Sequence, residues 1–219
     1  MTPLFAVLQQ RVAAWREAGY PTDAYPAISE ILGWAAASDD GRALRFLRRP
    51  QVLALETYWY LRMIEGTPHI FDLYRRLYPP EDRLGELLAA LGIPDDAFRS
   101  TNFSFSRLTE RIQADDAFVK DFKLEALRET LTLGYPSYIL ALAMGAGKTI
   151  LIGAIAATEF AMAIEYPDGL FVANALVFAP GKTIIESLRE LVEVPYRHVL
   201  PPRMHKSFAA SVKFTFTRD

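Results

Sequence analysis

The N-terminal part of the chain places apolar and polar side chains at helical spacing. In residues 3–18, apolar side chains recur every three or four positions, and Gly19 follows where such a helix would end. This pattern predicts an amphipathic helix over 3–18. A second helix is predicted over 26–37. A third is predicted from Pro50, a residue that suits the first turn of a helix, to Gly66.

The segment 66–136 continues the helical pattern, with interruptions by proline and glycine. One stripe of apolar side chains at helical spacing consists of Leu84, Leu87, Leu88 and Leu91. Such a stripe is typical of a helix face that packs into a core. We therefore interpret the apolar positions of this segment as core.

The pattern changes after residue 136. Three short apolar or alternating runs predict strands, at 138–143, 175–179 and 212–217. Helices are predicted between them, at 148–166 and 183–192. Strand, helix, strand, helix and strand at this spacing is typical of a parallel α/β unit. We therefore predict an α/β fold, with a helical N-terminal region followed by a parallel sheet.

Composition limits the kinds of site that the chain can hold. There is no cysteine, which excludes disulfides, cysteine-ligated zinc and cysteine nucleophiles. The formal net charge is −2, so any contact with nucleic acid would depend on a local basic patch. The sequence has no signal peptide and no uninterrupted apolar stretch of about 20 residues. We therefore expect a soluble, cytoplasmic protein without a membrane partner.

The most specific motif is GAGKT, which follows a predicted strand and opens a predicted helix. This is the context of a phosphate-binding loop. Its glycines let backbone N–H groups turn toward phosphate oxygens, and the helix N-terminus adds a partial positive charge. In such a loop Lys148 contacts the β- and γ-phosphates, and the Thr149 hydroxyl binds Mg²⁺. The predicted nucleotide-binding residues are Gly145, Ala146, Gly147, Lys148 and Thr149.

Three segments occur in the order found in superfamily 2 helicases. LAMGAGKT at 142–149 resembles motif I, LRRPQ at 47–51 resembles the glutamine element that precedes the motor core, and ALVFAPGKT at 175–183 resembles motif Ia. The segments ALETYWYLR, EGTPHIFDLYRRL and YILALAMGAGKT resemble the restriction endonuclease R subunit, the type III Res-like group of DEAD/DEAH helicases. This resemblance covers most of the chain from about residue 44.

The resemblance implies a domain organisation and partners. It implies N-terminal helices over 1–65, a helical insertion over 66–136 and a partial RecA-like, ATP-binding P-loop domain over 137–219. It also implies ATP and Mg²⁺ as cofactors, with Gln51 reading adenine through an amide that both donates and accepts. Arg48 would face the nucleotide or pair with a carboxylate. In the full-length protein the implied partners are double-stranded DNA and a methyltransferase or specificity subunit.

Motif Ia would contact the nucleic-acid backbone, and its candidate residues are Pro180, Gly181, Lys182 and Thr183. A DNA phosphate could bind Lys182, Thr183 and the helix N-terminus, but Thr183 could equally cap that helix. Basic residues also outnumber acidic ones in 195–219. That excess is typical either of a nucleic-acid face or of solvated surface charge.

No DExH box follows motif I in this sequence, since no acidic pair ends an apolar run after Thr149. We therefore expect the N-terminal ATP-binding part of a longer DNA helicase or translocase, truncated before that box. We also expect that this stretch alone hydrolyses ATP poorly. Two other interpretations stay open. One is a self-contained P-loop nucleotide-binding enzyme such as a small phosphotransferase, and the other is a non-catalytic interaction module that docks through its helical segment.

Overall fold

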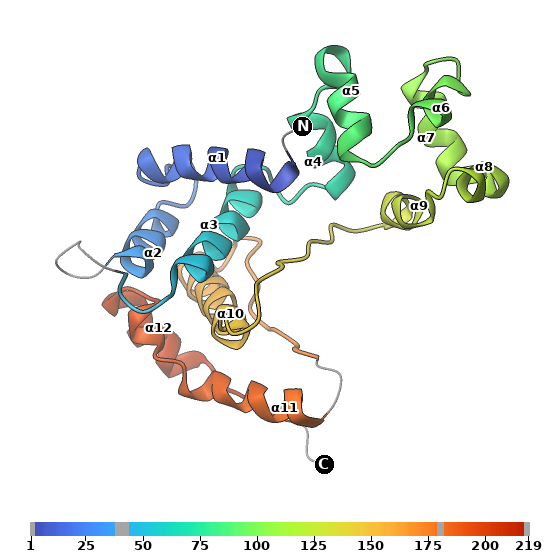
Figure 1. The fold of residues 1–219 in the computed structure, drawn as a ribbon. Coiled ribbons are helices and arrows are strands. Elements are labelled where there is room, and N and C mark those ends of the chain that lie inside the picture. The colour runs from blue at the N-terminus through green and yellow to red at the C-terminus, as the bar shows by residue number, and fades with distance from the viewer. Residues whose placement is uncertain (1–2, 38–43, 179–181, 217–219) are drawn as a thin grey trace. The chain divides into compact units, whose positions relative to one another are not determined.

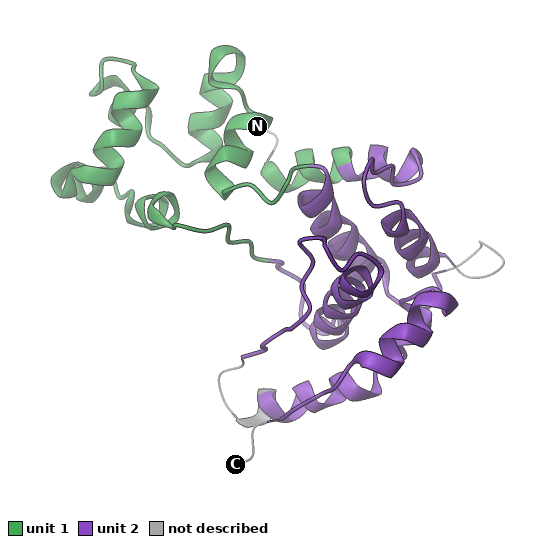
Figure 2. Ribbon diagram, turned by 180° about the vertical axis from the view of Figure 1, so that it is seen from behind, with its two compact units in different colours: residues 1–11, 65–139 green, residues 12–64, 140–219 purple. Residues whose placement is uncertain are grey.

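The computed structural model describes residues 3–37, 44–178 and 182–216 of the chain. Within these residues the regular elements are α-helices and short 3-10 helices, and no β-strand is present (Figure 1). The chain divides into two compact units (Figure 2). Unit 1 consists of residues 1–11 and 65–139, and unit 2 of residues 12–64 and 140–219.

The prediction of an α/β fold with a parallel sheet is wrong for the described residues. The described residues of the segments predicted as strands, 138–143, 175–178 and 212–216, have no regular secondary structure, and no backbone hydrogen bond joins one of these segments to another. Their apolar side chains are largely exposed, as at Ile139 (91%) and Phe178 (83%). A strand exists only where a neighbouring strand pairs with its N–H and C=O groups. The described part of the chain is therefore all-helical.

Unit 2 is built around α10 (Lys148–Glu165), which contacts α2 (Ala27–Ala36), α3 (Arg49–Met63) and α12 (Pro202–Ser211) (Figure 1). Neighbours on several sides explain why the helix is apolar around most of its circumference. Its buried side chains include Leu151, Ala154, Ala157, Ala161 and Met162. The predicted helix over 148–166 is confirmed.

The other helices of unit 2 follow the sequence pattern in part. α2 and α3 confirm two predicted helices, and α1 (Leu4–Glu17), which belongs to unit 2 only from Val12 on, confirms the first. The predicted helix over 183–192 forms α11 (Lys182–Leu188), continued by the 3-10 turn η1 (Arg189–Glu193). A second 3-10 turn, η2 (Tyr196–His198), leads to α12, which the sequence pattern did not predict.

α3 also carries a buried carboxylate, Glu56, which faces Arg16 and Tyr20 and is 1% exposed. The Arg16 guanidinium and the Tyr20 hydroxyl both donate to it, the latter at 2.6 Å. Trp15 lies edge-on to Tyr60 in the same region, with ring centroids 5.7 Å apart. These contacts hold α3 on the side away from α10.

Unit 1 contains the helices of the predicted helical segment. They are α4 (Ile70–Leu77), α5 (Pro80–Ala90), α6 (Asp95–Arg99), α7 (Phe105–Ala114), α8 (Asp116–Asp121) and α9 (Glu125–Thr132). Their shared core includes Leu88, Leu108, Ile112 and Phe118, so the interpretation of the apolar stripes as core is confirmed. Among the described residues of the chain, no helix is long and apolar enough to cross a membrane.

Candidate functional site

The GAGKT segment forms a tight loop immediately before α10. Gly145 and Gly147 have φ angles of +76° and +77°, in the left-handed region that glycine adopts without strain. The Ala146 N–H donates to the carbonyl of Ala143 at 3.2 Å, and α10 begins at Lys148. The motif therefore forms a glycine loop at a helix N-terminus, although the described residues before it form no strand.

The first turn of α10 is suited to an anion. No side chain caps this helix end, and its first turn contains no acidic residue. Its N–H groups therefore lack an intrahelical acceptor and carry a partial positive charge. The exposed Lys148 ammonium donates to the neutral carbonyl of Ala143 at 3.1 Å. A phosphate oxygen is a stronger acceptor for an ammonium than a carbonyl oxygen, so a phosphate would compete well for it.

Gln51 reaches this loop from the first turn of α3. Its side chain is 1% exposed. Oε1 accepts a hydrogen bond from the Arg48 N–H at 2.7 Å and thereby caps α3. Nε2 donates to the carbonyl of Gly147 at 2.9 Å. The structure therefore brings Gln51 to the loop, with its amide bonded to the backbone at both ends. Reading adenine would require the amide to exchange one of these bonds.

Arg48 makes a second contact between the start of α3 and the loop. Its Nη1 donates to the carbonyl of Gly145 at 2.9 Å. The first turn of α3, like that of α10, contains no acidic residue. The N-terminus of α10 follows the loop directly, and the N-terminus of α3 contacts it through Arg48 and Gln51. The exposed cations Arg48 and Lys148 lie at these two helix ends. This concentration of positive charge favours an anionic ligand.

The residues at the loop fit the phosphates of a nucleotide. For Mg²⁺ the loop offers the hydroxyl of the half-buried Thr149. Within the described ranges, no group of three or more histidine, aspartate or glutamate side chains could hold a metal ion. Mg²⁺ in nucleotide sites is bound largely by phosphates and water with one or two protein ligands. Thr149 would therefore share the ion with phosphate oxygens.

The predicted DNA-contacting segment can be described only in part. Pro180 and Gly181 lie outside the described residues, as do the side chains of Lys182 and Thr183. In the basic stretch 195–219, Arg203 forms ion pairs with Glu30 and Glu165, on α2 and α10. Arg203 is therefore engaged in packing α12 onto unit 2, and it contributes less to a basic face than the sequence suggested.

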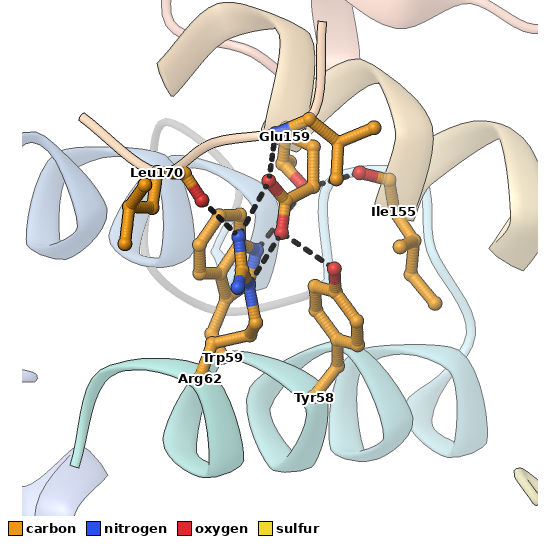
Figure 3. A network of polar contacts seen from close by, with 8 residues as sticks. Tyr58, Trp59, Arg62, Ile155, Glu159 and Leu170 are labelled. Carbon is orange, nitrogen blue, oxygen red and sulfur yellow. Dashed lines mark hydrogen bonds and ion pairs between the residues drawn. The ribbon is translucent and has the colours of Figure 1, made fainter. Parts of the chain in front are cut away.

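A polar network along α3 and α10 was missed from the sequence (Figure 3). The Glu159 carboxylate, 1% exposed, accepts hydrogen bonds from Tyr58, Arg62 and the Val172 N–H. Burial raises the pKa of the Tyr58 hydroxyl, and its bond to Glu159 raises this pKa further. The only sequence signal was Glu159 itself, a carboxylate in the middle of an apolar helix. Its role could not be inferred without knowing that Tyr58 and Arg62 of another helix contact it.

Comparisons with known proteins do not add to this picture. A search of protein-family models, of curated proteins and of solved structures finds no match to this chain. The assignment of a function therefore rests on the chain's own residues and on their arrangement around the loop.

Proposed function

We propose that the loop 145–149 binds the phosphates of ATP together with Mg²⁺. The observation that carries this proposal is the pair of hydrogen bonds from Gln51 and Arg48 to the carbonyls of Gly147 and Gly145. They join two segments, 96 residues apart at Gln51 and Gly147, that resemble the glutamine element and motif I of superfamily 2 helicases. These bonds hold the start of α3 at the glycine loop, so the two helicase-like segments lie together as a nucleotide site would require.

In this proposal, different residues of the chain bind different parts of MgATP. The uncapped N–H groups at the start of α10 and the Lys148 ammonium bind phosphate oxygens. The Thr149 hydroxyl binds Mg²⁺, which neutralises phosphate charge when it is present. Gln51 supports the loop and, in this proposal, also reads the adenine edge.

The wider proposal is the ATP-binding N-terminal part of a DNA helicase or translocase subunit of a type III-like restriction system. Its partners are double-stranded DNA, bound near Lys182 and Thr183, and a methyltransferase or specificity subunit. Its location is the cytoplasm. The order of the three helicase-like segments supports this assignment, and the absence of cysteine agrees with a reducing compartment.

Titration calorimetry with MgATP tests nucleotide binding. Lys148→Ala should weaken binding about 10- to 100-fold, because a hydrogen bond to a charged group contributes about 1.5–3 kcal/mol. Lys120→Ala, at an exposed lysine of α8, is the matched control and should bind like the native chain. Equal affinity of the native chain and Lys148→Ala contradicts the proposal.

Titration with double-stranded DNA distinguishes the proposed motor subunit from the alternative, a small phosphotransferase. In a motor the two ligands are thermodynamically linked, so DNA should change the affinity for MgATP and MgATP should change the affinity for DNA by the same factor. A small phosphotransferase predicts no such linkage. The two titrations can be made on the same protein by calorimetry and by fluorescence anisotropy.

A further inference from the structure

Glu159 joins three segments of unit 2. Its Oε1 accepts from the Arg62 Nε at 2.9 Å and from the Tyr58 hydroxyl, and its Oε2 accepts from the Arg62 Nη2 at 3.2 Å (Figure 3). Oε2 also accepts from the Val172 N–H at 2.9 Å. The same Arg62 donates to the carbonyl of Leu170 at 2.8 Å. The carboxylate therefore fixes α3 and the segment after α10 to α10 itself.

The Glu159 network and the proposed nucleotide loop lie at different positions along the same two helices, α3 and α10. Gln51 contacts Gly147 near the start of both helices, and Arg62 contacts Glu159 further along both. The separations along the two helices are nearly equal, about 16–18 Å at 1.5 Å per residue. α3 and α10 therefore run in the same direction and in register from the loop to Glu159.

One face of α3 carries all of these contacts. Gln51, Leu55, Tyr58 and Arg62 recur at helical spacing along it, and Trp59 adds a bond to the Thr158 hydroxyl at 3.1 Å. A displacement of α3 along α10 would break the bonds at Glu159 and the bond of Gln51 at the loop together. The bonds at Glu159 and the bond of Gln51 therefore require the same axial position of α3 on α10.

We propose that Glu159 is a positioning residue for the nucleotide loop. Through Tyr58 and Arg62 it fixes the axial position of α3 on α10, and it thereby holds the Gln51 amide on the Gly147 carbonyl. This inference rests on the proposed ATP site, because it assigns Glu159 an effect on that site. A carboxylate that only stabilised the fold would leave the loop of the folded protein unchanged.

A double-mutant cycle tests this role. Glu159→Gln removes the charge that Arg62 faces and keeps the size of the side chain. In the native background it should weaken MgATP binding by about fivefold or more, the lower end of typical coupling between sites. In the Gln51→Ala background the same change should weaken binding less than about twofold, since the group through which it acts is gone. Equal losses in both backgrounds overturn the proposal.

Glu56→Gln is the matched control. Glu56 is as buried as Glu159 and is likewise bonded to an arginine and a tyrosine, but it faces α1. It should lower stability while MgATP affinity stays the same. If Glu56→Gln lowers affinity as much as Glu159→Gln does, the effect is general loss of structure and the proposal is wrong.

Amide hydrogen exchange in the nucleotide-free protein tests the same link without a ligand. Tyr58→Phe removes one hydroxyl and keeps the ring, while both bonds from Arg62 to Glu159 remain. It should accelerate exchange in the peptide 143–151, whereas Glu56→Gln should not. Unchanged exchange in this peptide overturns the positioning role even if the native chain binds MgATP. Accelerated exchange in a chain that does not bind MgATP upholds the mechanical link and rejects only the proposed ATP site.

Discussion

The side-chain amide of Gln51 donates to the carbonyl of Gly147 at 2.9 Å and so joins the first turn of α3 to the glycine loop before α10. A Cβ added at position 147 would collide with the Gln51 Nε2, so the amide would have to move and lose its bond to the Gly147 carbonyl. Gly147 is therefore constrained twice, by its φ of +77° and by the approach of this amide.

Gly147→Ala should destabilise the protein more than Gly145→Ala does. Both positions have positive φ, which costs about 1–3 kcal/mol for a non-glycine residue, but an added Cβ at Gly145 meets nothing within 4 Å. Urea unfolding of the two variants measures the difference. Adding Gln51→Ala to Gly147→Ala should recover the part due to the steric clash. No recovery would contradict the close approach of the two residues.

Gln51→Glu should separate the two hydrogen bonds of this side chain. A carboxylate can still accept from the Arg48 N–H and cap α3, but it cannot donate to the Gly147 carbonyl. We expect weaker MgATP binding and a larger loss of stability than for Gln51→Ala, because the buried carboxylate would face the Gly147 carbonyl oxygen without a donor between them. The measurements are titration calorimetry and urea unfolding. A smaller stability loss for Gln51→Glu than for Gln51→Ala would contradict the contact between this side chain and the Gly147 carbonyl.

Gln51→Ala should also narrow the preference for ATP over GTP, if the amide exchanges a backbone bond for the adenine edge. A site that hydrogen-bonds one base edge rejects another because its polar groups are left unpaired. Competition titrations with the two nucleotides give the ratio of affinities. An unchanged ratio would restrict Gln51 to supporting the loop.

The helices could be predicted from the sequence because their signals are local. Apolar spacing, Gly19 and Pro50 predicted the bounds of α1 and α3 to within a few residues. The strands could not, because a short apolar run such as 138–143 becomes a strand only if another segment pairs with it. α12 was missed although Pro202 in its first turn is a recognised start signal.

The site was predictable to a similar extent. The glycine loop followed from its own residues, and the resemblance to helicases pointed to Gln51. Its bond to Gly147 links positions too far apart for any periodic pattern to reveal. The role of Glu159 depends on Tyr58 and Arg62 from another helix, so no local signal in α10 could have identified it.

Stability should fall above about pH 10. Burial raises the pKa of the Tyr196 hydroxyl to about 12, and burial followed by a bond to Glu159 raises that of Tyr58. Both hydroxyls hold their protons more tightly in the folded state than in the unfolded state. Their contribution to the free energy of unfolding is therefore complete below the unfolded pKa of about 10, and it is lost as the pH rises through the folded pKa. For Tyr196 the loss amounts to about 3 kcal/mol at most, once the pH is above the folded pKa.

Tyr196→Phe is the control for this pH dependence. The variant lacks the bond from the hydroxyl to the Leu191 carbonyl, formed at 2.6 Å, and should lose about 1 kcal/mol at pH 8. Between pH 9.5 and 12 it should lose less stability than the native chain. Parallel curves of unfolding free energy against pH would contradict the assignment to Tyr196.

Binding to double-stranded DNA should be weak and should fall as salt rises, because phosphate contacts release counterions. Fluorescence anisotropy at several salt concentrations measures it. Lys206→Ala, at an exposed lysine of α12, should reduce affinity more than Arg203→Ala, since Arg203 is paired with Glu30 and Glu165. No binding even at low salt would count against a DNA face in this stretch.

Backbone amide NMR of the ¹⁵N-labelled protein can show whether the loop before α10 binds the phosphates of ATP, because it reports on the N–H groups proposed as ligands. The amide signals of Gly145, Gly147 and Lys148 should shift on titration with MgATP, and the Gly145 amide should shift far less with adenosine, which has no phosphates. If MgATP shifts other amides while these signals stay fixed, the phosphates bind elsewhere and the loop is not the nucleotide site.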